Sequence, residues 1–202
     1  MTIEYRVRAV EELFAGLDKE IAAFQSETGL GCRAGCGKCC THPEVEASPL
    51  EFLPWAFHVF LNGKAEATLE ELKLNKSAVC FLYRPLTVLD QHNGRCGDYV
   101  YRGLICRLFG YGASKDKFGE LRLATCKIIK EGQAENYNNA VEALKKGLYV
   151  PVFSDYYMRL NQIDFKLGNS ILPINKAMKV ALEDVLQYFA YRPFPNGYTD
   201  IA

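Results

Sequence analysis

Residues 31–40 read Gly31-Cys32-Arg33-Ala34-Gly35-Cys36-Gly37-Lys38-Cys39-Cys40, so four of the eight cysteines lie in one loop with the spacing C-x3-C-x2-C-C. Gaps this short let one loop supply several thiolates to a single zinc ion or iron–sulfur centre. A chain that wraps around an ion needs positive φ angles, which the three glycines of the stretch can adopt without strain. The stretch therefore predicts a metal-binding loop.

The other four cysteines follow at wide intervals and are Cys80, Cys96, Cys106 and Cys126. We expect them to converge on the loop in three dimensions, around zinc, iron or an iron–sulfur cluster. Cys39 and Cys40 are adjacent, so their side chains diverge, and one of them is available to a second metal, another cysteine or the core. Eight thiolates suffice for two four-ligand sites or one multinuclear site, and the spacing does not decide between these.

Basic residues accompany the cysteines. Residues 30–42 contain Arg33 and Lys38 but no acid, and residues 94–109 contain three arginines and a single aspartate. Thiolates around a metal leave net negative charge, which nearby donors offset, so we predict that Arg102 and Arg107 lie near sulfur. Histidine can replace a cysteine ligand, and the candidates are His42 and His92. His58 is expected to be structural.

Composition limits the class of protein. The 202 residues are 49% hydrophobic, enough for a core without the help of cysteines, and the 24 basic residues equal the 24 acidic ones. Such a balance gives no overall field that attracts nucleic acid or an anionic membrane. No apolar run reaches a membrane span, and the charged N-terminus lacks a signal-peptide core. We expect a cytoplasmic protein whose cysteines are metal ligands, the alternative being disulfides Cys80–Cys96 or Cys106–Cys126 in an exported one.

Helical periodicity dominates the rest of the chain. Residues 3–25 carry an apolar stripe that fits a helix on the core, or alternatively a dimer seam. Ser48, Pro49 and Glu51 form a helix start with a capping box, and Pro54 kinks that helix or delays it. Further helices are predicted over residues 65–75, 134–146, 152–167 and 174–191.

Residues 77–126 instead favour short strands and turns, with a hairpin turn at residues 116–120. The sequence thus predicts a single mainly α-helical domain over residues 1–202, with an irregular cysteine-rich metal-binding region and minor β structure. The cysteine core spans roughly residues 30–126, and a helical C-terminal part spans residues 133–192.

The compound pattern Cys32-x3-Cys36-x2-Cys39-Cys40, Cys80-Phe81-Leu82 and Cys96-x2-Tyr99-x2-Arg102-x3-Cys106-Arg107-x-Phe109 resembles the YkgJ-type cysteine-cluster family. That family commonly has Arg-Pro where this chain has Arg102 and Gly103. The resemblance implies a zinc- or iron-chelating domain over roughly residues 30–126, and it says little about a reaction. Some relatives are labelled iron–sulfur oxidoreductases, and flagellin lysine methylases contain a similar region. A redox or methyl-transfer enzyme with an iron–sulfur centre is therefore the alternative function.

Other functions fit less well. Radical S-adenosylmethionine enzymes share the C-x3-C-x2-C spacing, but they usually place an aromatic residue where this chain has Lys38, and their barrel needs repeated strand–helix units. A nucleic-acid zinc finger needs paired short spacings and a basic face. No catalytic residue stands out, so a metal ion is the expected partner, and the sequence identifies no protein partner.

Overall fold

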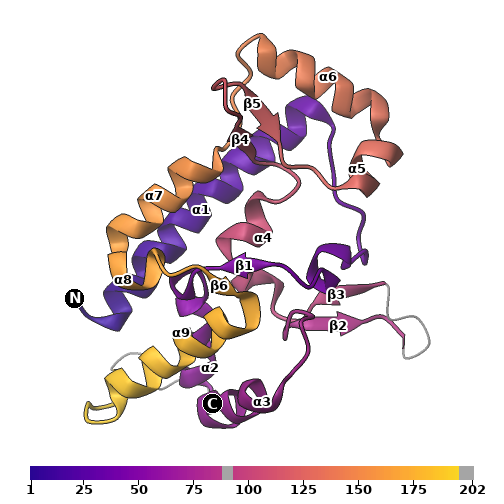
Figure 1. Cartoon of the computed structure of the whole chain (residues 1–202). Helices are drawn as coiled ribbons and strands as arrows, with labels where there is room; N and C mark the ends of the chain where they lie inside the picture. Colours follow the sequence, from indigo (N-terminus) through magenta and orange to yellow (C-terminus); the bar gives the residue numbers. More distant parts are fainter. Residues whose placement is uncertain (88–92, 196–202) are drawn as a thin grey trace.

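The computed structural model of the chain describes residues 1–87 and 93–195 as a single mainly α-helical domain, which confirms the predicted fold class (Figure 1). The helices are α1 (Ile3–Thr28), α2 (Leu53–Leu61), α3 (Ala65–Leu74), α4 (Leu104–Leu108), α5 (Lys127–Gly132), α6 (Ala134–Lys145), α7 (Phe153–Ile163), α8 (Phe165–Gly168) and α9 (Ile174–Phe189). Three short 3-10 helices are η1 (Lys38–Thr41), η2 (Pro49–Phe52) and η3 (Tyr99–Tyr101). In the described part of the chain, no helix has both the length and the apolar character needed to cross a membrane.

The strands of the described residues form short antiparallel pairs. β1 (Glu46–Ala47) pairs with β6 (Leu172–Pro173), β2 (Tyr83–Pro85) pairs with β3 (Gly94–Cys96), and β4 (Ala113–Lys115) pairs with β5 (Leu121–Leu123). The β4–β5 hairpin turns at the predicted residues, where the Asp116 amide donates to the Glu120 carbonyl over 2.9 Å.

Helix α1 lies along the core of the molecule. Thr2 caps its start by accepting from the Tyr5 amide, and it ends at Gly29, whose φ is +67°. Every residue of the predicted apolar stripe is at most 5% exposed; the stripe is Ile3, Val7, Val10, Phe14, Leu17, Ile21 and Phe24. The interpretation that this stripe packs on the core of the chain is therefore confirmed.

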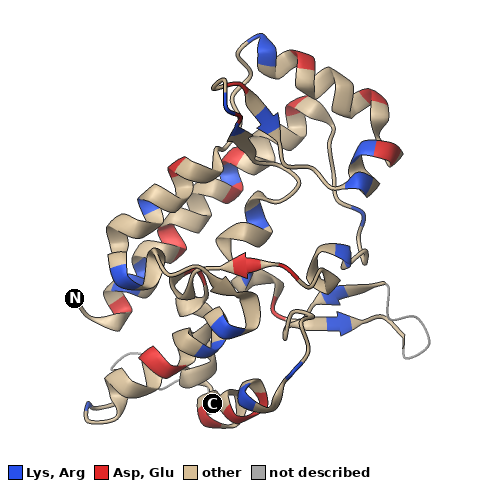
Figure 2. Cartoon of the chain, viewed as in Figure 1, with Lys and Arg blue, Asp and Glu red and all other residues tan. Residues whose placement is uncertain are grey.

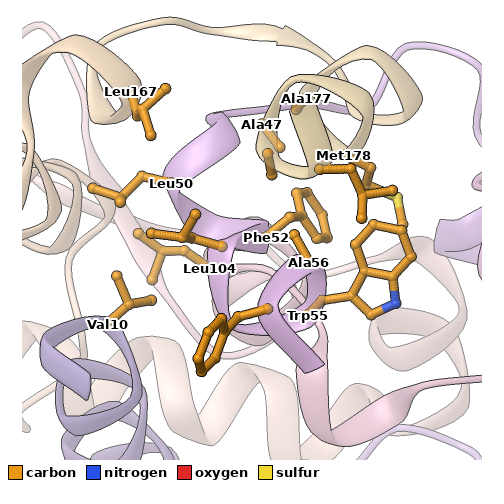
Figure 3. Packing of buried hydrophobic residues seen from close by; sticks show 14 of the residues in the cluster. Val10, Ala47, Leu50, Phe52, Trp55, Ala56, Leu104, Leu167, Ala177 and Met178 are labelled. Atoms are coloured by element: carbon orange, nitrogen blue, oxygen red, sulfur yellow. The ribbon is translucent and has the colours of Figure 1, made fainter. Parts of the chain in front are cut away.

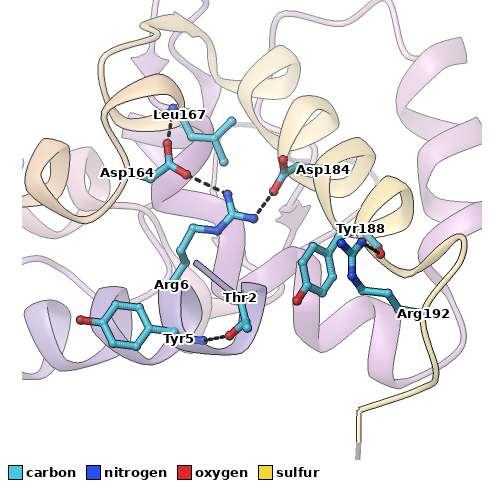
Figure 4. A network of polar contacts seen from close by, with 8 residues as sticks. All are labelled: Thr2, Tyr5, Arg6, Asp164, Leu167, Asp184, Tyr188 and Arg192. Carbon is cyan, nitrogen blue, oxygen red and sulfur yellow. Dashed lines mark hydrogen bonds and ion pairs between the residues drawn. The ribbon is translucent and has the colours of Figure 1, made fainter.

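A buried arginine joins α1 to the C-terminal helices. Arg6 pairs with Asp164 at 2.8 Å and with Asp184 at 2.9 Å (Figure 4). Asp164 also accepts from the Leu167 amide and caps α8. The prediction of one helix over residues 152–167 is wrong at this point, because the backbone of Asp164 is extended and divides the segment into α7 and α8.

The main core surrounds η2 and α2. Their side chains meet those of α1, α4, α8 and α9 there. Trp55, Leu104 and Met178 are among the residues of this core (Figure 3). The predicted helix start is present: Glu51 accepts from the Ser48 amide, and α2 begins at Leu53 with Pro54 in its first turn. A smaller cluster of buried residues lies between the end of α1, the β4–β5 hairpin, α5 and α6.

The prediction of short strands and turns over residues 77–126 is correct for β2 to β5 and misses α4. This five-residue helix begins after Gly103, whose α-carbon faces the Glu51 carboxylate and the Phe52 ring, where an added Cβ would lie 2.9 Å from both. The α4 backbone amide of Ile105 donates to that carboxylate over 2.9 Å. A distant side chain thus stabilises the start of a helix for which the local sequence has no capping residue.

Candidate metal centre

The cysteine loop is fixed by backbone contacts at several points. The side-chain amide of Gln133 accepts from the Gly31 amide over 2.9 Å and donates to the Gly31 carbonyl over 2.6 Å. The Tyr111 hydroxyl accepts from the Cys32 amide over 2.7 Å. Further along, the Gly35 carbonyl accepts from the Gly94 amide of β3 over 3.0 Å. The loop therefore lies between the α5–α6 junction and the β2–β3 hairpin.

Two of the three loop glycines have the predicted left-handed backbone. Gly35 has a φ of +71° and Gly37 a φ of +56°, whereas Gly31 is outside the positive-φ region, which corrects the prediction for that residue. A Cβ on Gly37 would lie 2.6 Å from the Tyr83 ring and 2.8 Å from the Gly94 carbonyl oxygen. Glycine is needed at this position for its backbone angle and for close packing on the hairpin.

Three of the distant cysteines meet the C-terminal end of the loop. The Cys80 amide donates to the Cys40 carbonyl over 3.0 Å, and Cys96 of β3 pairs in register with Tyr83 of β2. Cys106 lies in α4. Cys80 is buried in the main core, and Cys40, Cys96 and Cys106 pack half-buried against the same cluster. These four thiols form the core-side group.

The remaining distant cysteine lies at the other end of the loop. Cys126 caps α5 with its sulfur, which accepts from the Ile129 amide over 3.4 Å, and it packs on the smaller buried cluster. Gln133 at the end of α5 bonds Gly31, next to Cys32. Burial raises the pKa of Cys32, and the charges of Cys36, Cys39 and Cys126 raise it further. Cys32, Cys36, Cys39 and Cys126 form the loop-side group.

Cys39 of the loop-side group affects the pKa values of thiols in the core-side group. A hydrogen bond from the Cys40 thiol lowers the pKa of Cys39 and raises that of Cys40. Burial raises the pKa of Cys80 to about 11 and that of Cys106 well above the ordinary thiol value, and the charge of Cys39 adds to both. Of this hydrogen-bonded pair, Cys39 is thus the thiol that ionises more readily.

The donor set fits a thiophilic metal. All eight cysteines lie among the described residues, and all are free thiols, so neither of the two disulfides considered as the alternative is formed. Over residues 1–87 and 93–195, no three histidine, cysteine or acidic side chains have already converged into a metal-ligand cluster. Cys32 and Cys39 are exposed, so these side chains have room to turn toward a bound ion. Zinc and iron centres both accept such thiolate ligands.

The two arginines predicted to lie near sulfur both pair with Asp18 of α1. Arg107 pairs with Asp18, donates to the Val100 and Arg102 carbonyls, and stacks over the Phe14 ring. Arg102 also contacts Asp18, at 3.4 Å. Burial raises the pKa of Cys96, and the positive charge of Arg102 acts in the opposite direction. Arg102 is therefore an electrostatic neighbour of Cys96. Burial lowers the pKa of Arg107 and the charge of Cys106 raises it, so Arg107 is an electrostatic neighbour of Cys106.

Positive charge on the surface of the site comes from other residues. Arg84 of β2 pairs in register with Arg95 of β3, and both are exposed beside the loop that carries Lys38 (Figure 2). Arg84, which the sequence reasoning missed, also donates to the Phe81 carbonyl and so closes the turn after Cys80.

The histidines differ in their surroundings. His42 is exposed, and its Nδ1 accepts from the Glu44 amide over 3.3 Å. His58 stacks on Tyr101 with the ring centroids 4.5 Å apart and bonds its hydroxyl, contacts that fit the structural role expected for it. His92 lies outside the described residues.

Besides Arg84, four further residues at the site were not singled out as site residues from the sequence. They are Glu51, Tyr111, Gln133 and Asn175, and each hydrogen-bonds the backbone at a cysteine or at its sequence neighbour. The capping box was a signal for Glu51, but only for its local role. The other three have no local pattern that would have identified them.

Residues 31–127 match a family model named CxxCxxCC, which is described as a "putative zinc- or iron-chelating domain". Residues 31–127 of the chain are therefore similar to this family. The CxxCxxCC segment includes all eight cysteines, although the first gap here has three residues where the family name indicates two. No curated protein and no solved structure matches the chain. The predicted resemblance to a zinc- or iron-chelating domain is confirmed, and a metal ion is the ligand that this family indicates.

Proposed function

We propose that the chain binds zinc or iron through its eight cysteines, arranged as two adjoining thiolate sites. The loop-side site consists of Cys32, Cys36, Cys39 and Cys126, and the core-side site consists of Cys40, Cys80, Cys96 and Cys106. One observation carries the proposal: segments far apart in the sequence bond to the backbone of the same loop. The Cys80 amide donates to the Cys40 carbonyl, and the Gly94 amide, near Cys96, donates to the Gly35 carbonyl. The Gln133 side chain, which follows Cys126, accepts from the Gly31 amide.

The electrostatics of the thiols support this division for all but Cys39, which acts on Cys32 and also on the four core-side thiols. The pKa values of Cys40 and Cys106 respond to the charge of Cys80, whereas that of Cys32 responds to the charge of Cys126. When bound, zinc would crosslink the converging segments, and an iron–sulfur centre would in addition carry electrons. The chain itself supplies the thiols, the glycine turns that bring them together and the exposed arginines that offset thiolate charge. We place this function in the cytoplasm, because eight free thiols persist in a reducing compartment.

Anaerobic purification followed by metal analysis tests the proposal. We expect zinc or iron to copurify, and we expect Cys36→Ser and Cys106→Ser each to lower the bound metal. Ala34→Ser is the matched control, because it introduces the same side chain into the same loop without removing a thiol. Unchanged metal content in both cysteine variants would overturn the ligand assignment.

Colour distinguishes the two kinds of metal. A colourless protein with zinc alone indicates a structural or carried ion. A brown protein whose visible absorption is bleached by dithionite indicates an iron–sulfur centre and favours the redox or methyl-transfer alternative.

A further inference from the structure

Asn175 brackets Cys80 with three hydrogen bonds. Its Nδ2 donates to the Ser77 carbonyl over 3.0 Å and to the Val79 carbonyl over 2.8 Å. Its Oδ1 accepts from the Phe81 amide over 2.7 Å. All three partners are backbone groups, and two of them belong to the residues directly before and after Cys80. Asn175 is the second residue of α9, a 16-residue helix packed on the main core.

Gln133 acts in the same way on the first cysteine. Its Oε1 and Nε2 atoms bond the amide and the carbonyl of Gly31, the residue before Cys32. Gln133 lies at the junction of α5 and α6 and is half-buried. In both residues, the oxygen and the nitrogen of the side-chain amide form hydrogen bonds with backbone groups of residues close to a cysteine.

The segments that these amides contact have no regular structure of their own. The chain around Cys80 is formed by turns, and the chain before Cys36 is irregular loop. Fixing such backbone costs conformational entropy of about 1–2 kcal/mol for each residue. A paired amide contact offsets part of this cost and selects one position for the neighbouring thiol. Neither amide bonds a cysteine side chain, so both act through the backbone.

We propose that Asn175 and Gln133 are positioning residues that hold Cys80 and Cys32 in place for a thiophilic divalent cation. Both residues lie beyond the CxxCxxCC segment of residues 31–127. The metal centre is therefore a composite of that segment and the helices that follow it. This inference rests on the proposed metal binding of the chain.

The test uses the full-length chain with Asn175→Ala, Gln133→Ala and the control Asn139→Ala, which truncates an exposed asparagine of α6. Metal-free protein is titrated anaerobically with Zn²⁺ against a competing chelator. Outer-shell partners of metal ligands typically change affinity by 10–100-fold, so we expect binding to be about 10–100-fold weaker in both variants and unchanged in the control.

Two further measurements separate positioning from general stability. Co²⁺ replaces Zn²⁺, and the intensity of the sulfur-to-cobalt absorption reports the number of bound thiolates, which we expect to fall in both variants. Alkylation of the metal-free protein by iodoacetamide, mapped by mass spectrometry, reports the freedom of each thiol. We expect Cys80, which is 8% exposed, to react at least about tenfold faster in Asn175→Ala, because the turn loses all three hydrogen bonds to Asn175 and a tenfold change corresponds to only about 1.4 kcal/mol.

The outcomes are distinct. Wild-type protein that binds neither Zn²⁺ nor Co²⁺ refutes the proposed function, while the alkylation rates still test the bracketing of Cys80. Wild-type protein that binds metal, with both variants equal to the control in affinity, cobalt absorption and alkylation, overturns the positioning role. Lower stability with all three readouts unchanged also overturns it, because the two amides would then be structural only.

Discussion

Glu51→Gln removes one acceptor and one negative charge from a carboxylate that has no exposed surface. Its Oε1 accepts from the Ser48 amide over 2.8 Å, and its Oε2 accepts from the Ile105 amide over 2.9 Å. The Tyr157 hydroxyl also bonds the carboxylate. Glutamine is almost the same size as glutamate, so the change tests the hydrogen bonds and the charge without opening a cavity.

The magnitude follows from these contacts. Glutamine keeps one acceptor oxygen, and its NH₂ group then faces a backbone amide that cannot accept from it. A buried polar group left without a partner costs about 1–3 kcal/mol, and the substitution creates two, for a gross loss of roughly 2–6 kcal/mol. Burial raises the pKa of Glu51, so the ionised carboxylate itself is costly and its removal offsets part of this loss. We expect the free energy of unfolding to fall by about 2–4 kcal/mol.

Urea unfolding of the metal-free protein at neutral pH, followed by far-ultraviolet circular dichroism, measures this effect. Glu66→Gln on the exposed face of α3 is the control, and we expect it to change the unfolding free energy by less than about 0.5 kcal/mol. Because Ile105 precedes Cys106, we also expect Glu51→Gln to weaken metal binding at the core-side site. A change in stability no larger than that of the control would refute the assigned role of Glu51.

Other perturbations have separate expected outcomes. Gly37→Ala combines a positive φ with a Cβ that would lie 2.6 Å from a carbon of the Tyr83 ring. Gly63→Ala is the control, because Gly63 has a positive φ but open space around its α-carbon. We expect urea unfolding to show that Gly37→Ala is about 1–3 kcal/mol more destabilising than the control, and equal costs would contradict this. Arg6→Met leaves two carboxylates without their shared partner, and we expect a loss of about 2–4 kcal/mol, against less than about 1 kcal/mol for Arg122→Met, whose side chain is 70% exposed. For the metal-free chain, the folded state keeps the Cys80 thiol protonated to about pH 11, compared with an ordinary thiol value of 9.0. A raised folded-state pKa gives stability that is present below the unfolded pKa and is lost as pH rises through the folded pKa. We therefore expect the free energy of unfolding to decline between pH 9.0 and about pH 11. A flat profile over this range would exclude the contribution of Cys80.

Local patterns predict the regular elements of this chain well. The stripe from Ile3 to Phe24 has helical spacing, and its burial requires only that one face of the helix meets the core. Pro54 marks the start of α2 because proline suits the first turn of a helix, and the hairpin turn at residues 116–120 follows from its turn-forming residues. In each of these places, the residues that determine the structure are within a few positions of one another.

The rest depends on contacts between distant residues. Glu51 bonds Ile105 across 54 positions, and Gln133 bonds Gly31 across 102, and no periodicity connects either pair. The proposed partition of the cysteines has the same origin, because Cys106 and Cys126 pack on different buried clusters far along the chain from the loop. The partner of Arg107 was missed for this reason too, since Asp18 lies on α1 outside its apolar stripe and resembles any other surface acid in the sequence.

The single tryptophan of the chain gives the centre an intrinsic optical reporter. Trp55 is 1% exposed, and its indole nitrogen donates to Asp98 over 2.9 Å. The backbone amide of Asp98 in turn bonds the thiol of Cys96. Indole emission should therefore change as an ion arrives at the core-side thiols, with quenching by iron and a smaller response to zinc. Occupancy can then be followed in the unlabelled protein by its own fluorescence.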